Sequence, residues 1–220
     1  MIMDGNGRWA SARGLPVEEG HREGARALRR TVEAAVDLGI ASLAVYAFST
    51  ENWARPPDEV ESIIELMDET IDRELPDLAK QGVRTRFFGR RDRIPVVLQE
   101  KMARLEAETG HLDTLQLWIA FDYGGRAELV EATRRILEDG VGPQDVSEEA
   151  IGARLYAPEL PDPDLVIRTS GEQRVSNFLL WQSAYAEFVF DDTLWPDFGE
   201  DRLRAALDEY ASRGRRFGGR

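Results

Sequence analysis

The chain has 220 residues, of which 42% are hydrophobic, so it can bury a core and is expected to form one domain spanning residues 1–220. Its 41 acidic residues outnumber its 28 basic ones, and the net charge of −13 disfavours binding to nucleic acid or to an anionic membrane. Cysteine is absent, which excludes disulfides, thiolate zinc sites and a cysteine nucleophile, and two histidines are too few for a multi-histidine metal site. No apolar run approaches the length of a membrane span. We therefore expect a cytoplasmic protein that holds any anionic substrate with a local cluster of basic residues.

Hydrophobic periodicity predicts an alternation of helices and strands along the chain. In order, the pattern predicts a helix ending at Leu38, a strand over 42–48, a helix from Pro57 to about Ala79, a strand over 84–88, a helix opening at Pro95, a strand over 114–121 and a helix over 127–137. A short helix over 147–155, strands over 165–169 and 187–190 and a helix over 199–212 complete the chain. This order is typical of an α/β fold with a mostly parallel central sheet and helices on both faces.

The first strand is an exception, because only Met1, Ile2 and Met3 precede the polar residue Asp4. A central parallel strand of three residues is unusually short. We therefore expect this strand to be truncated and the natural chain to begin upstream of Met1.

Four polar segments directly follow predicted strands. They are Asp4 with its neighbours, residues 49–55, residues 123–126 and residues 168–177. Because ligands of parallel α/β sheets bind where the carboxyl ends of the strands meet, we expect these segments to converge at one edge of the sheet.

The segment MDGNGRW at 3–9 combines groups that suit a metal ion and a phosphate ester. Asp4 is the hard oxygen ligand that Mg²⁺ prefers. Gly5 and Gly7 let the backbone approach a phosphate closely, and Asn6 and Arg8 add hydrogen-bond donors.

The segment IRTSGEQRVSN at 167–177 offers two arginines six residues apart, Arg168 and Arg174, together with hydroxyl groups. Arginine is well suited to binding phosphate through paired hydrogen bonds. The two segments together predict a place where two phosphate-bearing groups meet beside Mg²⁺.

These motifs closely resemble those of the cis-prenyltransferases, the undecaprenyl diphosphate synthase family. The resemblance rests on the segments DGNGRWA (4–10), GHREG (20–24), YAFSTENW (46–53), YGGR (123–126), DLVIR through WQ (164–182) and WPDF (195–198). It extends over nearly the whole chain.

The resemblance implies a Mg²⁺-dependent enzyme that repeatedly adds isopentenyl diphosphate to an allylic diphosphate such as farnesyl diphosphate. The small Ala47, at a position that lines the product tunnel in the family, and the long apolar face of the helix at 57–79 favour a long-chain cis-polyprenyl product such as undecaprenyl diphosphate. The resemblance also implies a homodimer and at most a peripheral association with membranes, through the lipid product. We expect aromatic side chains at the dimer interface, from the set Trp181, Tyr185, Phe188, Phe190 and Trp195.

The family's functional residues map onto named positions of this chain. The allylic diphosphate is expected on Gly5, Asn6, Gly7, Arg8, Trp9 and His21, and the isopentenyl diphosphate on Arg168, Arg174 and Ser176. Asp4 and Glu187 are expected to hold the metal. The loop of Ser49, Thr50, Glu51, Asn52, Trp53 and Arg55 is expected to close over the substrates, and the motif at 216–218 to reach a phosphate site. Asp4, Asn52 and Ser49 are the expected catalytic residues, with the proton acceptor left open between Asn52 with Ser49 and a diphosphate oxygen.

The chain departs from the family pattern at three places. Residues 16–19 (PVEE) stand where many members carry an arginine, Gln173 where some have histidine, and Asp122 where some have asparagine. We expect altered substrate affinity rather than loss of the chemistry.

Four other interpretations compete with a long-chain synthase. A non-catalytic partner subunit of the same fold would lack the metal carboxylate and the phosphate arginines, which this chain keeps. A hydrolase using Asp4 as nucleophile would need a second acid where Asn6 stands. A short-chain synthase of the Z,E-farnesyl type stays open, whereas the presence of Asn52, Arg55 and Glu187 argues against irregular coupling.

The tryptophans Trp53, Trp181 and Trp195 also suit packing in the core or at a dimer interface, in place of contact with a substrate.

Overall fold

The computed structural model of this protein describes residues 1–213, and the motif at 216–218 therefore lies outside the described residues. Within this range five strands form parallel ladders. β1 (Ser42–Ser49), β3 (Leu115–Tyr123) and β2 (Val83–Phe88) pair in the order β1–β3–β2, and β4 (Leu165–Arg168) pairs with β5 (Glu187–Phe190).

Ile2 connects the two groups of strands. It forms parallel bridges with Tyr46 of β1 on one side and with Arg168 of β4 on the other. The short first strand predicted from the sequence is thus reduced to a single bridging residue. This position sets Asp4 at the carboxyl edge of the sheet, between the ends of β1 and β4.

The described helices are distributed along the chain as the periodicity predicted, with one early addition. They are α1 (Asn6–Ser11), α2 (Val17–Asp37), α3 (Pro57–Lys80), α4 (Val96–Thr109), α5 (Gly125–Glu138), α6 (Glu148–Gly152) and α7 (Glu200–Ser212), with 3₁₀ turns η1 (Thr50–Ala54), η2 (Pro143–Asp145) and η3 (Trp195–Asp197). Prolines stand at the start of two helices. Pro16 directly precedes α2, and Pro56 and Pro57 stand at the start of α3, where the fixed φ of proline suits a helix. In residues 1–213 no helix is both long enough and apolar enough to cross a bilayer.

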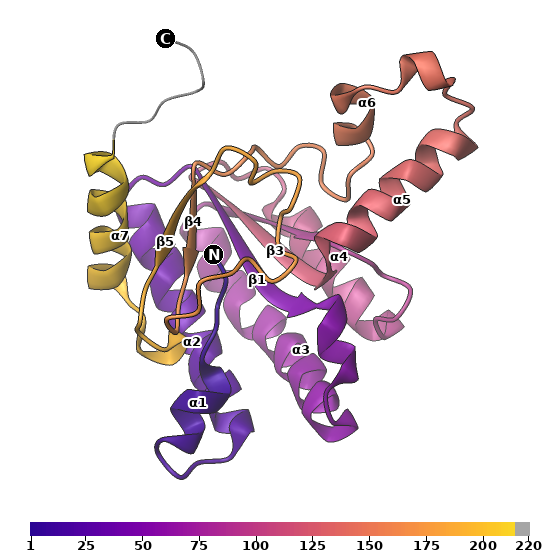
Figure 1. The fold of residues 1–220 in the computed structure, drawn as a ribbon. Coiled ribbons are helices and arrows are strands. Elements are labelled where there is room, and N and C mark those ends of the chain that lie inside the picture. The colour runs from indigo at the N-terminus through magenta and orange to yellow at the C-terminus, as the bar shows by residue number, and fades with distance from the viewer. Residues whose placement is uncertain (214–220) are drawn as a thin grey trace.

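Helices α2, α3, α4 and α7 cover one face of the sheet, where Val32, Ile71, Leu98 and Leu203 pack against strand residues such as Leu117 (Figure 1). The predicted α/β fold with a parallel sheet is confirmed.

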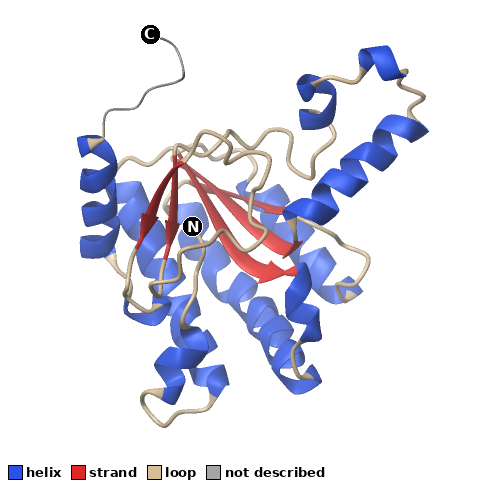
Figure 2. Cartoon of the chain, viewed as in Figure 1, coloured by secondary structure: helices blue, strands red, loops and turns tan. Residues whose placement is uncertain are grey.

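On the other face α5 contacts the sheet through Glu128, which accepts from the Tyr123 hydroxyl at 2.6 Å, and loops cover the rest. Loop residues such as Leu160 and Phe178 pack there against Trp118 and Tyr123, and loops, drawn in tan, cross over the strands in Figure 2. The prolines in the segment 158–163 favour a loop there, because proline lacks the N–H that a continuing helix needs.

Trp195 belongs to the core and not to a protein surface. It is 1% exposed, stacks on Phe198 and donates a hydrogen bond from its indole Nε1 to the carbonyl of Gly24 at 2.9 Å. Its expected place at a dimer interface is therefore wrong. Tyr185, by contrast, is 75% exposed.

Candidate active site

A polar cavity of about 570 Å³ opens at the carboxyl edge of the sheet. Its lining contains many of the residues predicted for the site, namely Asp4, Asn6, His21, Ser49, Glu51, Asn52, Arg55, Arg168, Arg174 and Ser176. Its apolar wall comes from Ile2, Met3, Tyr46, Ala47 and Ile63. Segments far apart in the sequence thus meet in one place, as expected for loops that follow parallel strands.

The guanidinium of Arg168 joins the two polar motifs. It donates to Asp4 Oδ2 at 2.8 Å, to Ser176 Oγ at 2.7 Å and to the carbonyl oxygen of Arg174 at 2.6 Å. Its side chain is 4% exposed, and its Nε has no hydrogen-bond partner among the described residues. A buried charge needs such partners. The hydrogen bonds of Arg168 therefore fix the positions of the two motifs relative to each other.

Asp4 is held in its ionised form. Burial by itself raises the pKa of this carboxyl, but hydrogen bonds from Arg168 and Ser170 and the nearby charges of Arg168 and Arg8 lower the pKa below its ordinary value. The Arg8 guanidinium lies 3.3 Å from Asp4 Oδ1. A half-buried, ionised carboxylate beside a basic cavity is a group that could hold Mg²⁺ together with a substrate phosphate.

Gly5 allows the chain to turn from Asp4 into α1. Its φ of 115° lies in the left-handed region, and a Cβ at this position would come within 2.9 Å of Leu194 Cδ2. The left-handed φ strains any larger residue at this position, and its Cβ would also require Leu194 to shift. From α1, Arg8 donates to the carbonyl of Ser170 at 3.2 Å and to its Oγ at 2.5 Å, so the first motif is tied to the second once more.

His21 sits in a chain of polar side chains at the cavity wall. Its Nδ1 lies 3.4 Å from Asn6 Nδ2, and its Nε2 lies 3.3 Å from Glu59, which also accepts from Arg55 at 2.7 Å. Burial lowers the pKa of His21, and the hydrogen bond to Glu59 opposes this effect only in part. Sequence reasoning missed Glu59, which lies in the first turn of α3, four residues after Arg55 in the preceding loop.

The turn after β1 is organised by Ser49 and Asn52. Asn52 Oδ1 accepts the backbone N–H of Ser49 at 2.8 Å, while the Ser49 hydroxyl caps the turn reciprocally. Both residues are thereby placed at the cavity with fixed side chains. The amide N–H groups of Asn52 stay available as donors to a substrate oxygen.

Two predicted substrate contacts, Trp9 and Trp53, are turned away from the cavity. Trp53 donates to Asp122 at 2.9 Å and packs edge-on against Phe48. Trp9 donates to Asp197 at 2.7 Å. These partners explain the difference, because an indole N–H that is already paired inside the protein keeps its ring in place.

Gly5, Gly7, Arg8 and Thr50 do not line the cavity either, and their assignment to substrate binding stays a prediction. Thr50 donates to Glu51 at 3.1 Å.

Glu187 does not lie beside Asp4 within the described chain. It is the first residue of β5 and pairs in register with Leu165, whereas Arg168, which binds Asp4, pairs with Phe190 at the other end of the strand. The Glu187 carboxylate instead accepts from Arg213 at 2.9 Å. The expected pair of metal carboxylates is therefore not formed here, and residues 1–213 contain no cluster of three or more His, Cys, Asp or Glu side chains placed to hold a metal.

Asn177 is a lining residue that sequence reasoning did not single out. Its Oδ1 accepts the backbone N–H of Arg126 at 2.9 Å, and its Nδ2 donates to Glu51 at 2.7 Å. The residue has a φ of 66°, which asparagine tolerates better than most residues. The segment 123–126 thus supports the site through Asn177 and does not line the cavity itself.

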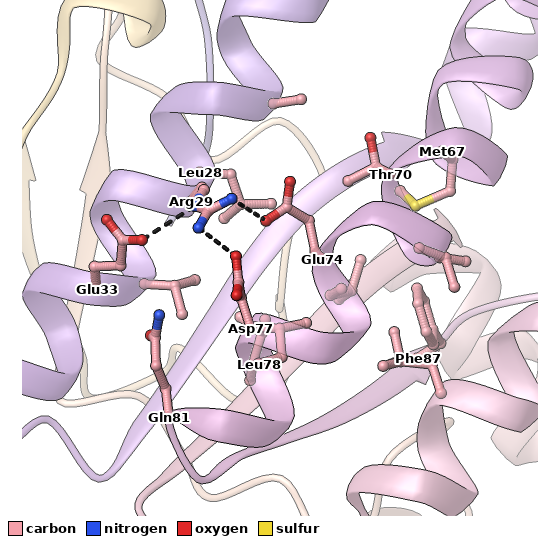
Figure 3. Close-up of a pocket in the computed structure, with 16 residues that line it drawn as sticks. Leu28, Arg29, Glu33, Met67, Thr70, Glu74, Asp77, Leu78, Gln81 and Phe87 are labelled. Carbon is pink, nitrogen blue, oxygen red and sulfur yellow. Dashed lines mark hydrogen bonds and ion pairs between the residues drawn. The ribbon is translucent and has the colours of Figure 1, made fainter.

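A second, apolar cavity of about 70 Å³ lies between α2, α3 and the sheet (Figure 3). Leu28 and Val32 of α2, Met67 and Leu78 of α3, and Phe87 of β2 contribute to its lining. Helix α3 contributes to both cavities, since Ile63 lines the polar one and Met67, one turn further along the helix, lines the apolar one.

Comparison with known proteins relates this architecture to one family. Residues 2–218 match the model of the prenyltransferase family described as "Putative undecaprenyl diphosphate synthase". The isoprenyl transferase of Fusobacterium nucleatum is 49% identical over 219 residues, which are 100% of this chain and 94% of that protein. A ditrans,polycis-undecaprenyl-diphosphate synthase ((2E,6E)-farnesyl-diphosphate specific) of Xanthomonas axonopodis pv. citri is 46% identical over 222 residues, 99% of this chain and 86% of that protein.

Two solved structures have a similar fold. Lavandulyl diphosphate synthase from Lavandula x intermedia, in complex with dimethylallyl diphosphate, superposes with a TM-score of 0.95 at 34% identity over 99% of this chain and 96% of the other. A probable undecaprenyl diphosphate synthase from Campylobacter jejuni superposes with a TM-score of 0.81 at 35% identity, over 90% of this chain and 93% of the other. The chain therefore belongs to the undecaprenyl diphosphate synthase family of isoprenyl transferases, which confirms the family predicted from its motifs.

Proposed function

We propose that this protein condenses isopentenyl diphosphate units onto an allylic diphosphate, with farnesyl diphosphate as the starter, to give a long-chain cis-polyprenyl diphosphate of the undecaprenyl kind. The observation that carries the proposal is the buried Arg168 guanidinium, which binds both polar motifs at a cavity lined by two further arginines. On a chain with a net charge of −13, this local basic cluster is suited to anionic diphosphates.

The two diphosphates are assigned to opposite sides of Asp4. Arg8, Asn6 and His21 hold the allylic diphosphate, with the turn at Gly5 bringing backbone close to it. Arg168, Arg174 and Ser176 hold the isopentenyl diphosphate. Binding both substrates in one cavity orients the reacting carbons, which replaces a bimolecular encounter with a step inside one complex.

Asp4 makes the site suitable for a Mg²⁺ ion that is shared with a substrate phosphate. Asp4 is the carboxylate that would hold the ion, and phosphate oxygens of the substrate would complete its coordination, as is common for Mg²⁺. Bound there, the ion would neutralise negative charge that develops on the leaving diphosphate. Arg8 adds donors on the same side, and His21 holds the Asn6 side chain there through its Nδ1, so the departing charge is met by groups that are already in position.

Asn52 and Ser49 position the isopentenyl end of the reaction. Because Asn52 Oδ1 already accepts from the backbone of Ser49, the side chain presents its N–H groups and serves better as a donor than as a base. We therefore assign the proton acceptor to a diphosphate oxygen, with Asn52 orienting that diphosphate.

The proposed product length is argued from helix α3, which lines both cavities. Ala47 and Ile63 stand at the wall of the polar cavity, and α3 leads from there to the apolar cavity, which can receive the hydrocarbon tail. The Xanthomonas relative, by its name, makes undecaprenyl diphosphate from farnesyl diphosphate. A short-chain synthase is the alternative, because the lavandulyl diphosphate synthase has nearly the same fold and a different product name.

Incubation of the protein with labelled isopentenyl diphosphate, Mg²⁺ and either farnesyl or geranyl diphosphate tests the proposal. We expect incorporation into products longer than fifteen carbons, sized by reverse-phase chromatography after removal of the phosphates. Incorporation that stops at fifteen carbons would support the short-chain alternative. No incorporation with either starter would refute the proposed function.

A further inference from the structure

Arg29 links α2 to α3 at the rim of the apolar cavity. Its guanidinium lies 3.4 Å from Glu74 and also binds Asp77, both on α3, while its Nε donates to Glu33 on its own helix at 3.1 Å (Figure 3). All four side chains line the rim of this cavity. We call this group of four the Arg29 clasp.

The clasp spans a weak point of α3. Pro76 lies inside the helix, between the two carboxylates that Arg29 binds. A proline in a helix interior removes one backbone hydrogen bond and crowds the preceding turn, so the helix bends more easily there. By holding Glu74 before the proline and Asp77 after it, Arg29 ties α3 to α2 on both sides of Pro76.

The same stretch of α3 forms a wall of the apolar cavity. Met67 and Ile71 line it before Pro76, and Leu78 lines it afterwards. The cavity of about 70 Å³ is smaller than one of about 150 Å³ that accepts a benzene molecule. A chain of several five-carbon units therefore requires α3 and α2 to move apart at this end.

We propose that Arg29 is a specificity-determining residue of the reaction, because its clasp resists the widening that longer products need. This inference rests on the proposed function, since it concerns where the growing chain goes. An intact clasp slows the later additions and leaves the first addition unaffected, because the first condensation takes place in the polar cavity. The clasp therefore sets the upper end of the product range.

Arg29→Met tests the inference, because methionine keeps an apolar stem at the cavity rim and removes the charge. We expect the fraction of products longer than the main wild-type product to rise about two- to fivefold, the range expected for loss of a partly exposed ion-pair network. The rate of the first condensation should stay the same. Asp77→Asn should act in the same direction, and the double variant should show less than the sum of both effects.

Arg26→Met is the matched control. Arg26 lies three residues earlier on α2, pairs only with Glu23 among the described residues at 2.8 Å, and does not line the cavity. It should leave the product range unchanged. A rise in salt concentration should lengthen the wild-type products and leave those of Arg29→Met unaffected, because salt screens exposed ion pairs.

Hydrogen exchange separates failure of the clasp from failure of the proposed function. Amides of residues 77–81 should exchange faster in Arg29→Met than in Arg26→Met, a difference that needs no catalysis. An active Arg29→Met with wild-type or shorter products would overturn the role of Arg29 alone. A wild-type protein without any condensation activity would overturn the proposed function and, with it, this assignment.

Discussion

Arg168 and Asp4, which are 164 positions apart in sequence, are joined by a hydrogen bond of 2.8 Å between the guanidinium and Oδ2. The contact is possible because Ile2 bridges β1 and β4, which brings the residue two positions later next to the end of β4. Each partner depends on the other, since Arg168 is buried and Asp4 is its only carboxylate partner among residues 1–213. The proposed metal carboxylate and the proposed phosphate arginine therefore form one hydrogen-bonded unit.

The first prediction follows from this unit. Asp4→Ala should reduce turnover by about 10²-fold or more, because it removes both the proposed Mg²⁺ ligand and the partner that orients Arg168. Asp4→Asn should lose a similar amount of activity but retain more stability, because its amide oxygen can still accept from Arg168. Initial rates at saturating substrate and Mg²⁺, with thermal unfolding of each variant, check this. Nearly full activity of Asp4→Asn would contradict the role of the charge.

The second prediction separates the two diphosphate sites. Arg174→Ala should raise the Michaelis constant for isopentenyl diphosphate about tenfold, the cost expected for one charge-assisted hydrogen bond, and leave that of the allylic substrate almost unchanged. Arg8→Ala should instead affect the allylic substrate or turnover, because Arg8 contacts Asp4 and Ser170. Steady-state kinetics with each substrate varied in turn decide the matter. Equal effects of both variants on both Michaelis constants would contradict the assignment of Arg174 and Arg8 to different diphosphates.

The third prediction concerns pH. The pKa of His21 is lowered below its ordinary value of 6.5, so the folded protein binds this proton less readily than the unfolded chain does. The contribution of neutral His21 to the free energy of unfolding is therefore present above about pH 6.5. It is lost as the pH falls through the lower pKa of the folded state. Asp4, whose pKa is also lowered, adds a loss of the same sign at more acidic pH.

Denaturant unfolding between about pH 7 and pH 5 measures this effect. The decrease in the free energy of unfolding should be smaller in His21→Gln than in the wild type. An identical pH dependence in His21→Gln would show that His21 does not contribute.

The fourth prediction concerns assembly, since the family resemblance implies a homodimer. Exposed apolar side chains that suit an interface are Tyr185 at 75% exposure and Leu137 at 72%, the latter on α5, which projects from the body in Figure 1. Light scattering at micromolar concentration should give twice the chain mass of 24.8 kDa. Tyr185→Arg should weaken the dimer, whereas Leu15→Arg, on a distant exposed loop, should not. A fully active monomer would contradict the proposed homodimer.

The fifth prediction concerns Ala47 and product length. Ala47→Leu adds an isobutyl group at the wall of the polar cavity, near Ile63, where the first units of the chain must pass. Overpacking of such a path costs about 1–3 kcal/mol, so we expect shorter products with a nearly normal first condensation. Chromatography of dephosphorylated products from wild type and variant side by side gives the answer. The same distribution in both would exclude Ala47 from the product path.

Much of the site followed from residue types placed after predicted strands. Asp4, Ser49, Asn52, Arg168 and Ser176 meet at one cavity as expected, because parallel strands carry their carboxyl ends to the same edge. Residues that support the site from outside these motifs, such as Glu59 and Asn177, were not found. Their roles depend on neighbours from other elements, and no local pattern indicates such neighbours.

The sequence by itself determined the family, the order of strands and helices and the chemical groups of the site, because periodicity and motifs are properties of neighbouring residues along the chain. The tertiary structure alone decided which of those groups face the cavity. Trp53 is turned toward Asp122, and Glu187 stands at the far end of β5 from the site. Arg29 of α2 likewise pairs with Glu74 and Asp77 of α3, on either side of Pro76. Such contacts join residues far apart in sequence, and only the packing of the elements determines where each side chain finds its partner.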